Sequence, residues 1–297
     1  AIADLSYHPN PAARTLRTLR SGRILVTVPD ISNPFFSEVI RGVEETAQEL
    51  GYSVLLGDTR YRADREEQYA GFLKRREADG LIFLGHRLPA TLADVVESAD
   101  GRAPIVNGCE YSADLGVSSV HIDNVAHAAD AMAHLYDLGH RRVGVVTGPL
   151  FSPLVRDRLD GTKQAAHAHG LADQLIVQPG DFTIEAGERE TAKMLALPDA
   201  PTAIFCFSDE MALGALAAVR KAGLGCPHDV SVIGFDDIKF ARFMVPPLST
   251  IRQPMAQIGQ ETVRMLHSIL IDGEAMPASL TLPHELVARA STGPVRG

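Results

Sequence analysis

The 297-residue chain alternates short apolar runs with longer stretches in which apolar and polar residues are mixed. Apolar runs that are rich in β-branched residues and bounded by Gly, Pro or Asp are typical of buried strands in parallel sheets. Seven segments fit this description and are predicted to be strands: residues 24–29, 53–56, 80–84, 104–106, 143–147, 203–207 and 230–235.

The mixed stretches place apolar residues three and four positions apart, which is the spacing along one face of a helix. Three such sets are Phe36, Val39, Ile40, Val43 and Ala47; Met132, Leu135 and Tyr136; and Met211, Leu213, Leu216 and Val219. Several helices are predicted to end at a glycine, because glycine tolerates the left-handed conformation that follows a helix. These glycines are Gly51, Gly139, Gly170 and Gly223.

Strands and helices alternate along the chain, and this order predicts an α/β fold with doubly wound parallel sheets. A chain of 297 residues is longer than one hydrophobic core usually supports. We therefore expect two similar lobes, each with its own sheet and about half of the chain, with a cleft between them.

Candidate binding residues follow the predicted strands, because ligands of open α/β sheets bind outside the carboxyl ends of the strands. They are aromatic, amide, guanidinium, hydroxyl and carboxylate side chains: Phe35, Phe36, Asn107, Arg158, Phe182, Ser208, Asp209 and Asp236. Carboxylates accept hydrogen bonds from vicinal hydroxyls, arginine donates through a rigid fork, and aromatic rings cover a flat or apolar face. This mixture indicates a neutral polyhydroxyl ligand.

Each of these groups also has a purely structural alternative. Asp209 or Asp236 could cap the following helix. Phe35 or Phe36 could belong to the core, since both fall on a predicted helix. Arg158 could form a surface ion pair with the aspartates on either side of it.

Motifs for catalysis and metal binding are absent from the sequence. It contains no GxxxxGK(S/T), GxGxxG, HExxH or GxSxG pattern. His167 and His169 would point to different faces of a helix, and His127 and His134 lack a third ligand. The three cysteines show no CxxC spacing, which fits a reducing cytoplasm. No run approaches 18 apolar residues, so we expect no membrane span. Because the motifs named above are absent, we expect no enzyme activity, cofactor or metal site.

The first residues carry a charge opposite to that of the rest of the chain. Residues 1–23 hold four arginines and one acid, whereas the remaining 274 residues hold 24 Lys+Arg and 36 Asp+Glu. A basic arm on an acidic body indicates binding to nucleic acid or another anionic surface, with a solvated terminus as the alternative. Asn10 and Pro11 also predict the start of a short helix, which is too short to be stable alone.

The arm resembles the hinge helix of bacterial repressors of the lactose/purine repressor (LacI/PurR) family, in the run Tyr-x-Pro-Asn-Pro-Ala-Ala-Arg-x-Leu-Arg that begins at Tyr7. The resemblance implies a chain that begins inside the DNA-binding headpiece, after most of its helix-turn-helix. It also implies a DNA operator as partner, with a leucine wedged into the minor groove. The implied DNA-binding residues are Asn10, Ala13, Arg14, Leu16 and Arg17.

The resemblance continues through almost the whole chain, and it implies three crossover strands between the lobes, near Asp123, Arg252 and Pro283. The implied domains are residues 1–22 (headpiece end and hinge), 23–123 with 252–282 (N-terminal lobe), and 124–251 with 283–297 (C-terminal lobe). It also adds Gln253 to the effector-binding residues.

Within the family, the chain is most similar to the nucleoside-responsive, cytidine type. The shared blocks include residues 28–31, 34–38, 120–124, 180–183 and 231–236. Ser152 and Leu154 differ from the base-reading residues of the purine repressors, which argues against a purine base as the effector.

The resulting expectation is a cytoplasmic, ligand-responsive repressor that binds a nucleoside such as cytidine or adenosine, with a free sugar as the alternative effector. Because operators of this kind have two-fold symmetry, we expect a homodimer. Residues 291–297 show no heptad that would support a tetramer. A periplasmic sugar-binding protein would explain the two lobes but not the basic arm, and a small-molecule enzyme would explain only the cleft.

Overall fold

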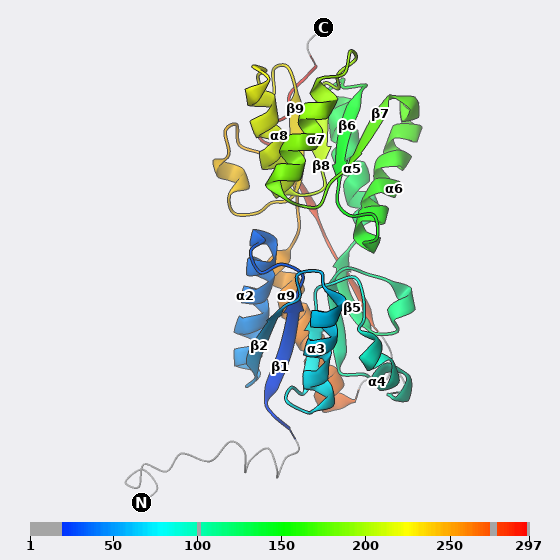
Figure 1. Ribbon diagram of the computed structural model, residues 1–297, viewed down its shortest axis with the longest axis vertical. Coiled ribbons are helices and arrows are strands. Elements are labelled where there is room, and N and C mark those ends of the chain that lie inside the picture. The colour runs from blue at the N-terminus through cyan, green and yellow to red at the C-terminus, as the bar shows by residue number, and fades with distance from the viewer. Residues whose placement is uncertain (1–19, 100–101, 274–277, 296–297) are drawn as a thin grey trace, which may run out of the picture. The chain divides into compact units, whose positions relative to one another are not determined.

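The computed structural model describes residues 20–99, 102–273 and 278–295 (Figure 1). The predicted DNA-binding residues Asn10, Ala13, Arg14, Leu16 and Arg17 lie outside these ranges.

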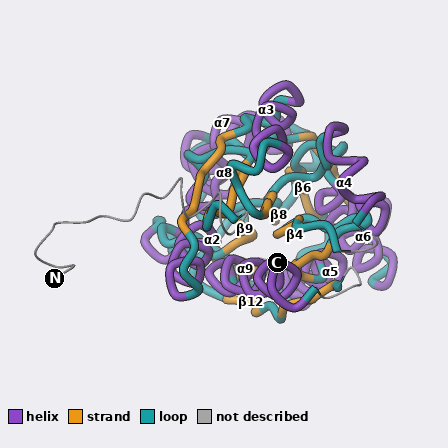
Figure 2. The backbone as a smooth tube through the Cα atoms, turned by 90° about the horizontal axis from the view of Figure 1, so that it is seen from below, coloured by secondary structure: helices purple, strands orange, loops and turns teal. Residues whose placement is uncertain are grey.

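The described chain forms two compact units. The first contains the described residues up to His121 together with Met255–Leu280, and the second contains Ile122–Pro254 and Thr281–Gly297. The chain therefore passes from one unit to the other three times. In both units the helices lie around the strands (Figures 1 and 2).

The first unit is built on a six-stranded sheet in the order β11-β5-β4-β3-β1-β2. Neighbouring strands from β2 to β5 pair in parallel. Every residue of β3, β4 and β5 is buried, as expected of apolar strands covered on both faces. The strands are β1 (Arg23–Val28), β2 (Ser53–Asp58), β3 (Gly80–Phe83), β4 (Ile105–Cys109), β5 (Ser118–Ile122) and β11 (Ser279–Leu282).

Four α-helices cover this sheet: α2 (Pro34–Glu49), α3 (Ala63–Lys74), α4 (Ala93–Ser98) and α9 (Met255–Asp272). Helix α2 begins where the Asn33 side chain accepts a hydrogen bond from the Phe35 N–H. It is followed by Gly51, whose φ of 81° lies in the left-handed region. Helices α2 and α9 pack against each other, and α9 also contacts β3 and β4.

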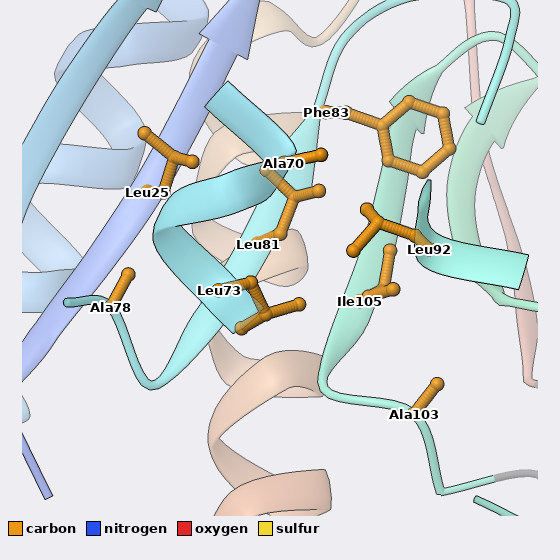
Figure 3. Close-up of a cluster of buried hydrophobic side chains, with 9 residues drawn as sticks. All are labelled: Leu25, Ala70, Leu73, Ala78, Leu81, Phe83, Leu92, Ala103 and Ile105. Atoms are coloured by element: carbon orange, nitrogen blue, oxygen red, sulfur yellow. The ribbon is translucent and has the colours of Figure 1, made fainter. Parts of the chain in front are cut away.

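A hydrophobic cluster joins α3 to the sheet (Figure 3). Ala70 and Leu73 of α3 pack with Leu25 of β1, Leu81 of β3 and Ile105 of β4. These side chains are at most 8% exposed. The cluster therefore fixes the strands whose carboxyl ends carry the candidate binding residues of this unit.

The second unit repeats the plan, with a six-stranded sheet in the order β12-β10-β9-β8-β6-β7. Its strands pair in parallel except at one edge, where β12 runs antiparallel to β10. The strands are β6 (Val143–Thr147), β7 (Leu175–Pro179), β8 (Ala203–Cys206), β9 (Ser231–Asp236), β10 (Ser249–Arg252) and β12 (Glu285–Val287). The helices are α5 (Asn124–Asp137), α6 (Pro153–Ala168), α7 (Ile184–Leu195) and α8 (Asp209–Lys221).

Glycines allow the helices of each pair to approach closely. A Cβ atom on Gly42 of α2 would lie 2.0 Å from the carbonyl oxygen of Ala256 in α9. A Cβ atom on Gly161 of α6 would lie equally close to the carbonyl oxygen of Val125 in α5. No side chain fits at either position. The glycines at the contact between α7 and α8 are Gly187 and Gly214.

The predicted fold class is confirmed, since each unit is an α/β structure built on a parallel sheet. All seven predicted strands are present, and all four predicted helix-ending glycines have positive φ. The other five strands did not stand out as apolar runs. The edge strand β7, for example, has no fully buried residue, so its sequence is less apolar.

Candidate functional site

Arg158 is the most extensively bonded of the candidate residues. It lies in α6 and is only 4% exposed. Its Nε donates to Asn124 Oδ1 at 2.9 Å, and its Nη1 donates to the Phe207 carbonyl at 2.6 Å. Its Cζ atom lies 3.6 Å from the centroid of the Phe235 ring, within cation–π range. The alternative of a surface ion pair within its own helix is therefore wrong.

Asp236 is the last residue of β9 and is 6% exposed. Its Oδ1 accepts a hydrogen bond from Gln253 Nε2 at 2.6 Å. Burial raises the pKa of Asp236 to about 7, although the positive charge of Arg158 and the bond from Gln253 lower it. The protein therefore holds a carboxyl group that changes its charge near neutral pH.

The backbone after β9 adopts an unusual conformation. Asp236 has a φ of 119° and Asp237 a φ of 59°, both in the region that favours glycine. Such residues cost about 1–3 kcal/mol each and cluster at binding sites. Two ion pairs hold the segment in place: Asp237 Oδ2 with Arg252 Nε at 2.8 Å, and Asp237 Oδ1 with Arg289 Nη2 at 2.6 Å.

Ser208 and Asp209 lie at the start of α8. Ser208 is the N-cap, and its Oγ accepts from the Met211 N–H at 3.2 Å. Asp209 is fully buried; its Oδ1 accepts from Thr250 Oγ1 at 2.6 Å and its Oδ2 from the Ile238 N–H at 2.8 Å. Burial and the nearby Asp236 raise the pKa of Asp209. The helix-cap alternative is wrong for both aspartates, since Ser208 caps α8 and Asp236 ends a strand.

Phe182 lies in the loop between β7 and α7, with a φ of 68°. Its ring rests against the backbone of Gly148, just after β6, where a Cβ atom would lie 2.3 Å from the Phe182 Cζ atom. Only glycine at residue 148 leaves room for the ring, which is half-buried. Phe182 therefore presents an aromatic side chain at the same edge of the sheet as Arg158 and Asp236.

The first unit places three candidates at the carboxyl edge of its own sheet. Asn107 in β4 donates from Nδ2 to the carbonyls of Phe83 and Gly85, both at 3.0 Å. Its Oδ1 is buried and has no hydrogen-bond partner within the described chain. An unsatisfied buried acceptor is costly, so a ligand donor would be favourable here. Phe35 and Phe36 pack edge to face in α2, and each side chain is largely buried, at 7% exposed.

Sequence reasoning missed the residues that support these groups. Asn124, which orients Arg158, carries no pattern of its own and lies 34 positions away along the chain. The sequence indicates His127 only as a candidate metal ligand, but its Nε2 is buried and has no hydrogen-bond partner among the described residues. Its ring lies beside those of His284 and Phe235. Burial lowers the pKa of His127 to about 3, so the ring is neutral at ordinary pH.

The described residues contain no group of three His, Cys, Asp or Glu side chains arranged to hold a metal ion. Within the same ranges, no helix has the length and apolar character needed to cross a membrane.

The second unit thus combines a buried guanidinium, a buried carboxyl group and aromatic rings at one edge of its sheet. Such a set can donate to and accept from hydroxyl groups and can cover a flat ring. Comparison with known proteins agrees with this class of binding domain, because the model of the "Periplasmic binding protein-like domain" family matches residues 132–292.

Curated relatives of this chain are transcriptional regulators. It is 41% identical to the HTH-type transcriptional repressor CytR of Escherichia coli strain K12, over 98% of this chain and 85% of that protein. It is 34% identical to the HTH-type transcriptional regulator DegA of Bacillus subtilis strain 168, over 98% of this chain and 87% of that protein. The chain belongs to the LacI/PurR family of transcriptional regulators. It is a ligand-responsive repressor rather than an enzyme.

Solved structures lead to the same family. A lac repressor dimer bound to operator and an anti-inducer matches with a TM-score of 0.84 at 28% identity, covering 97% of this chain and all of that chain. A LacI family regulator from Enterococcus faecium with bound ribose matches with a TM-score of 0.83 at 28% identity, covering 92% of this chain and all of that chain. The resemblance inferred from the hinge sequence is therefore confirmed.

Proposed function

We propose that the effector of this repressor is a nucleoside, such as cytidine or adenosine. The proposal is supported mainly by the arrangement of Arg158, Phe235 and Asp236. The Arg158 guanidinium covers the Phe235 ring, and its charge also acts on the buried carboxyl group of Asp236. The carboxyl group suits vicinal ribose hydroxyls, and the half-buried ring of Phe182 suits a base. The proposed contacts are Phe35, Phe36, Asn107, Arg158, Phe182, Ser208, Asp209, Asp236 and Gln253.

Not all of these residues need to touch the effector in the same way. Both oxygens of Asp209 accept protein donors, and Ser208 caps a helix. In this proposal Arg158, Asp236 and Asn107 supply the main polar contacts, and Asp209 also holds the segment after Asp236 by accepting from the Ile238 N–H. The orphaned Oδ1 of Asn107 would accept a ligand hydroxyl or amino group.

A free pentose or hexose is the second candidate, supported by a relative whose solved structure contains the pentose ribose. The solved structure of another relative contains a disaccharide, cellobiose. A sugar would use Arg158 and Asp236 but would leave the aromatic side chains without a base. Comparing a nucleoside with its free sugar separates the two candidates.

Residues 1–22 are proposed to bind the DNA operator. Two hinge helices of a cytoplasmic homodimer would lie together in the minor groove of an operator, with Leu16 as the wedge and Asn10, Ala13, Arg14 and Arg17 around it. Effector binding would bias whether these marginal helices pair, which couples the effector to DNA through a conformational equilibrium.

Operator affinity of the full-length protein tests this coupling. Leu16→Ala should weaken operator binding while leaving nucleoside affinity unchanged, because it removes the wedge and nothing at the effector contacts. The wild-type protein should change its operator affinity when nucleoside is added. Equal operator affinity of wild type and variant would show that Leu16 does not contact or deform DNA.

A further inference from the structure

A pocket lies at the edge of the first unit's sheet opposite to Asn107. Its volume is about 530 Å³, within the roughly 300–1,000 Å³ of ordinary small-molecule sites. Tyr52, Asp79 and Pro104 line it, and they directly precede β2, β3 and β4. The pocket is therefore at the amino ends of these strands and shares no lining residue with the proposed effector contacts.

The floor of the pocket is apolar. Leu73 of α3 and Ala78 are 8% and 2% exposed, and Val95 of α4 and Leu270 of α9 complete the surface. A floor of this kind gains free energy by covering an apolar ligand body.

The rim of the pocket is basic. Arg20, Lys74 and Arg76 line it together with a single acid, Asp79. Lys74 has a weak pairing, with its Nζ 3.8 Å from Asp94 Oδ2 and both side chains well exposed. Arg76 forms no ion pair with any residue that the structure describes, so its charge is available to a ligand. This positive rim stands out because the body of the chain is acidic.

The same pocket lies where the chain enters the unit from the N-terminal arm. Asp79 Oδ1 accepts from the N–H and Oγ of Ser21, at 2.6 and 2.9 Å, and its Oδ2 accepts from the Gly22 N–H at 2.8 Å. Arg20 Nη2 donates to the Leu270 carbonyl at 2.8 Å. A ligand in the pocket would therefore touch the residues that attach the arm to the unit.

We propose that this pocket is a second binding site, for a small amphipathic anion that carries a phosphate or carboxylate group on an apolar body. The anionic group binds at Arg76 and Lys74, and the apolar body lies on Leu73 and Leu270. An apolar floor distinguishes this site from a contact with the DNA backbone. Any effect of the ligand on DNA binding rests on the proposed function, but binding itself does not.

The test uses phenyl phosphate as the probe, titrated calorimetrically into the whole chain at low ionic strength without DNA or nucleoside. We expect one site per chain, and roughly five-fold weaker binding in Arg76→Gln, as expected for loss of one partly exposed charge contact. Arg75→Gln is the matched control. Arg75 is the neighbouring residue, but it pairs with Glu77 at 2.6 Å and does not line the pocket. Its loss should change affinity by less than about two-fold.

Four results would overturn the proposal. Phenyl phosphate could fail to bind. The two arginine variants could lose affinity equally, which would indicate attraction by net charge alone. Inorganic phosphate could bind as tightly as phenyl phosphate, which would show that the apolar floor is not used. A short DNA duplex that displaces the probe from wild type and not from Arg76→Gln would assign the pocket to the DNA backbone instead. Melting curves of both variants confirm that each remains folded.

Discussion

Arg158 and Phe235 form the central contact of the second unit, with the guanidinium carbon 3.6 Å from the ring centroid. Burial raises the pKa of the next residue, Asp236, and the positive charge of Arg158 lowers it, so the same guanidinium also acts electrostatically on a buried carboxyl group. The same guanidinium donates to Asn124 and to the Phe207 carbonyl, and thus ties α6 to α5 and to the end of β8. Arg158 therefore supports the fold as well as the proposed effector contacts.

Arg158→Ala should destabilise the second unit by about 3 kcal/mol, because it leaves two buried acceptors without their donor. Arg158→Lys should have a smaller effect, since an ammonium group keeps the charge but not the planar fork. Arg156→Ala on the exposed face of the same helix is the control and should change stability by less than about 0.5 kcal/mol. Urea unfolding measures all three, and equal stability of Arg158→Ala and Arg156→Ala would contradict the structural role.

Asp236 should make stability depend on pH. Burial raises its pKa from the ordinary 3.8 to about 7, so the folded state keeps a proton that the unfolded state releases. Stability from this group is therefore fully present at pH values below the unfolded pKa and is lost as the pH rises through about 7. Asp209 contributes in the same direction, because its pKa is also raised.

Unfolding experiments between pH 4 and pH 8, the range that brackets the pKa of Asp236, test this expectation. The loss of stability with rising pH should be smaller in Asp236→Asn, which has no proton to release. The exposed Asp173→Asn variant should follow the wild type. A pH profile of Asp236→Asn that matches wild type would show that Asp236 does not titrate in this range.

Gly42→Ala should be strongly destabilising, because the new Cβ atom would meet the Ala256 carbonyl oxygen at 2.0 Å and force α2 and α9 apart. We expect a loss of about 3 kcal/mol, comparable to overpacking a core position. Gly85→Ala is the control, since a Cβ atom there meets nothing within 4 Å. Thermal unfolding measures the stability of both variants. A Gly42→Ala protein as stable as Gly85→Ala would be inconsistent with the close helix contact.

A homodimer should form without DNA, because the two-fold symmetry of an operator requires paired subunits. Sedimentation velocity at micromolar concentration should show one species of twice the chain's mass of 31.9 kDa. A single species at the monomer mass would contradict the proposed assembly.

The fold could be predicted where local sequence alone determines structure. Gly51, Gly139, Gly170 and Gly223 each follow a helix with positive φ, because the requirement for a left-handed residue is local. The approach of Gly42 to Ala256 could not be predicted in this way. It depends on which helices become neighbours across more than 200 positions of sequence.

The same distinction applies to the candidate site. Asp236 and Asn107 can be predicted as candidates because each directly follows an apolar run of the sequence, and ligands of α/β sheets bind at the carboxyl ends of such strands. The hydrogen-bond donors to the buried aspartates come from elsewhere in the chain. Gln253, which follows β10, donates to Asp236, and Thr250 of β10 donates to Asp209. Burial, which raises the pKa of Asp236, depends on tertiary packing and not on the neighbouring sequence.

Calorimetric titration of wild type and Asp236→Ala with cytidine, adenosine, ribose and free bases tests whether the effector is a nucleoside. We expect a nucleoside to bind wild type more tightly than its separate sugar or base does. We also expect Asp236→Ala to lose affinity roughly ten-fold or more, since each charge-assisted bond is worth about 1.5–3 kcal/mol. Tight binding of a charged amino acid or a nucleotide phosphate, with no response to any nucleoside or sugar, would show that the effector is neither a nucleoside nor a sugar.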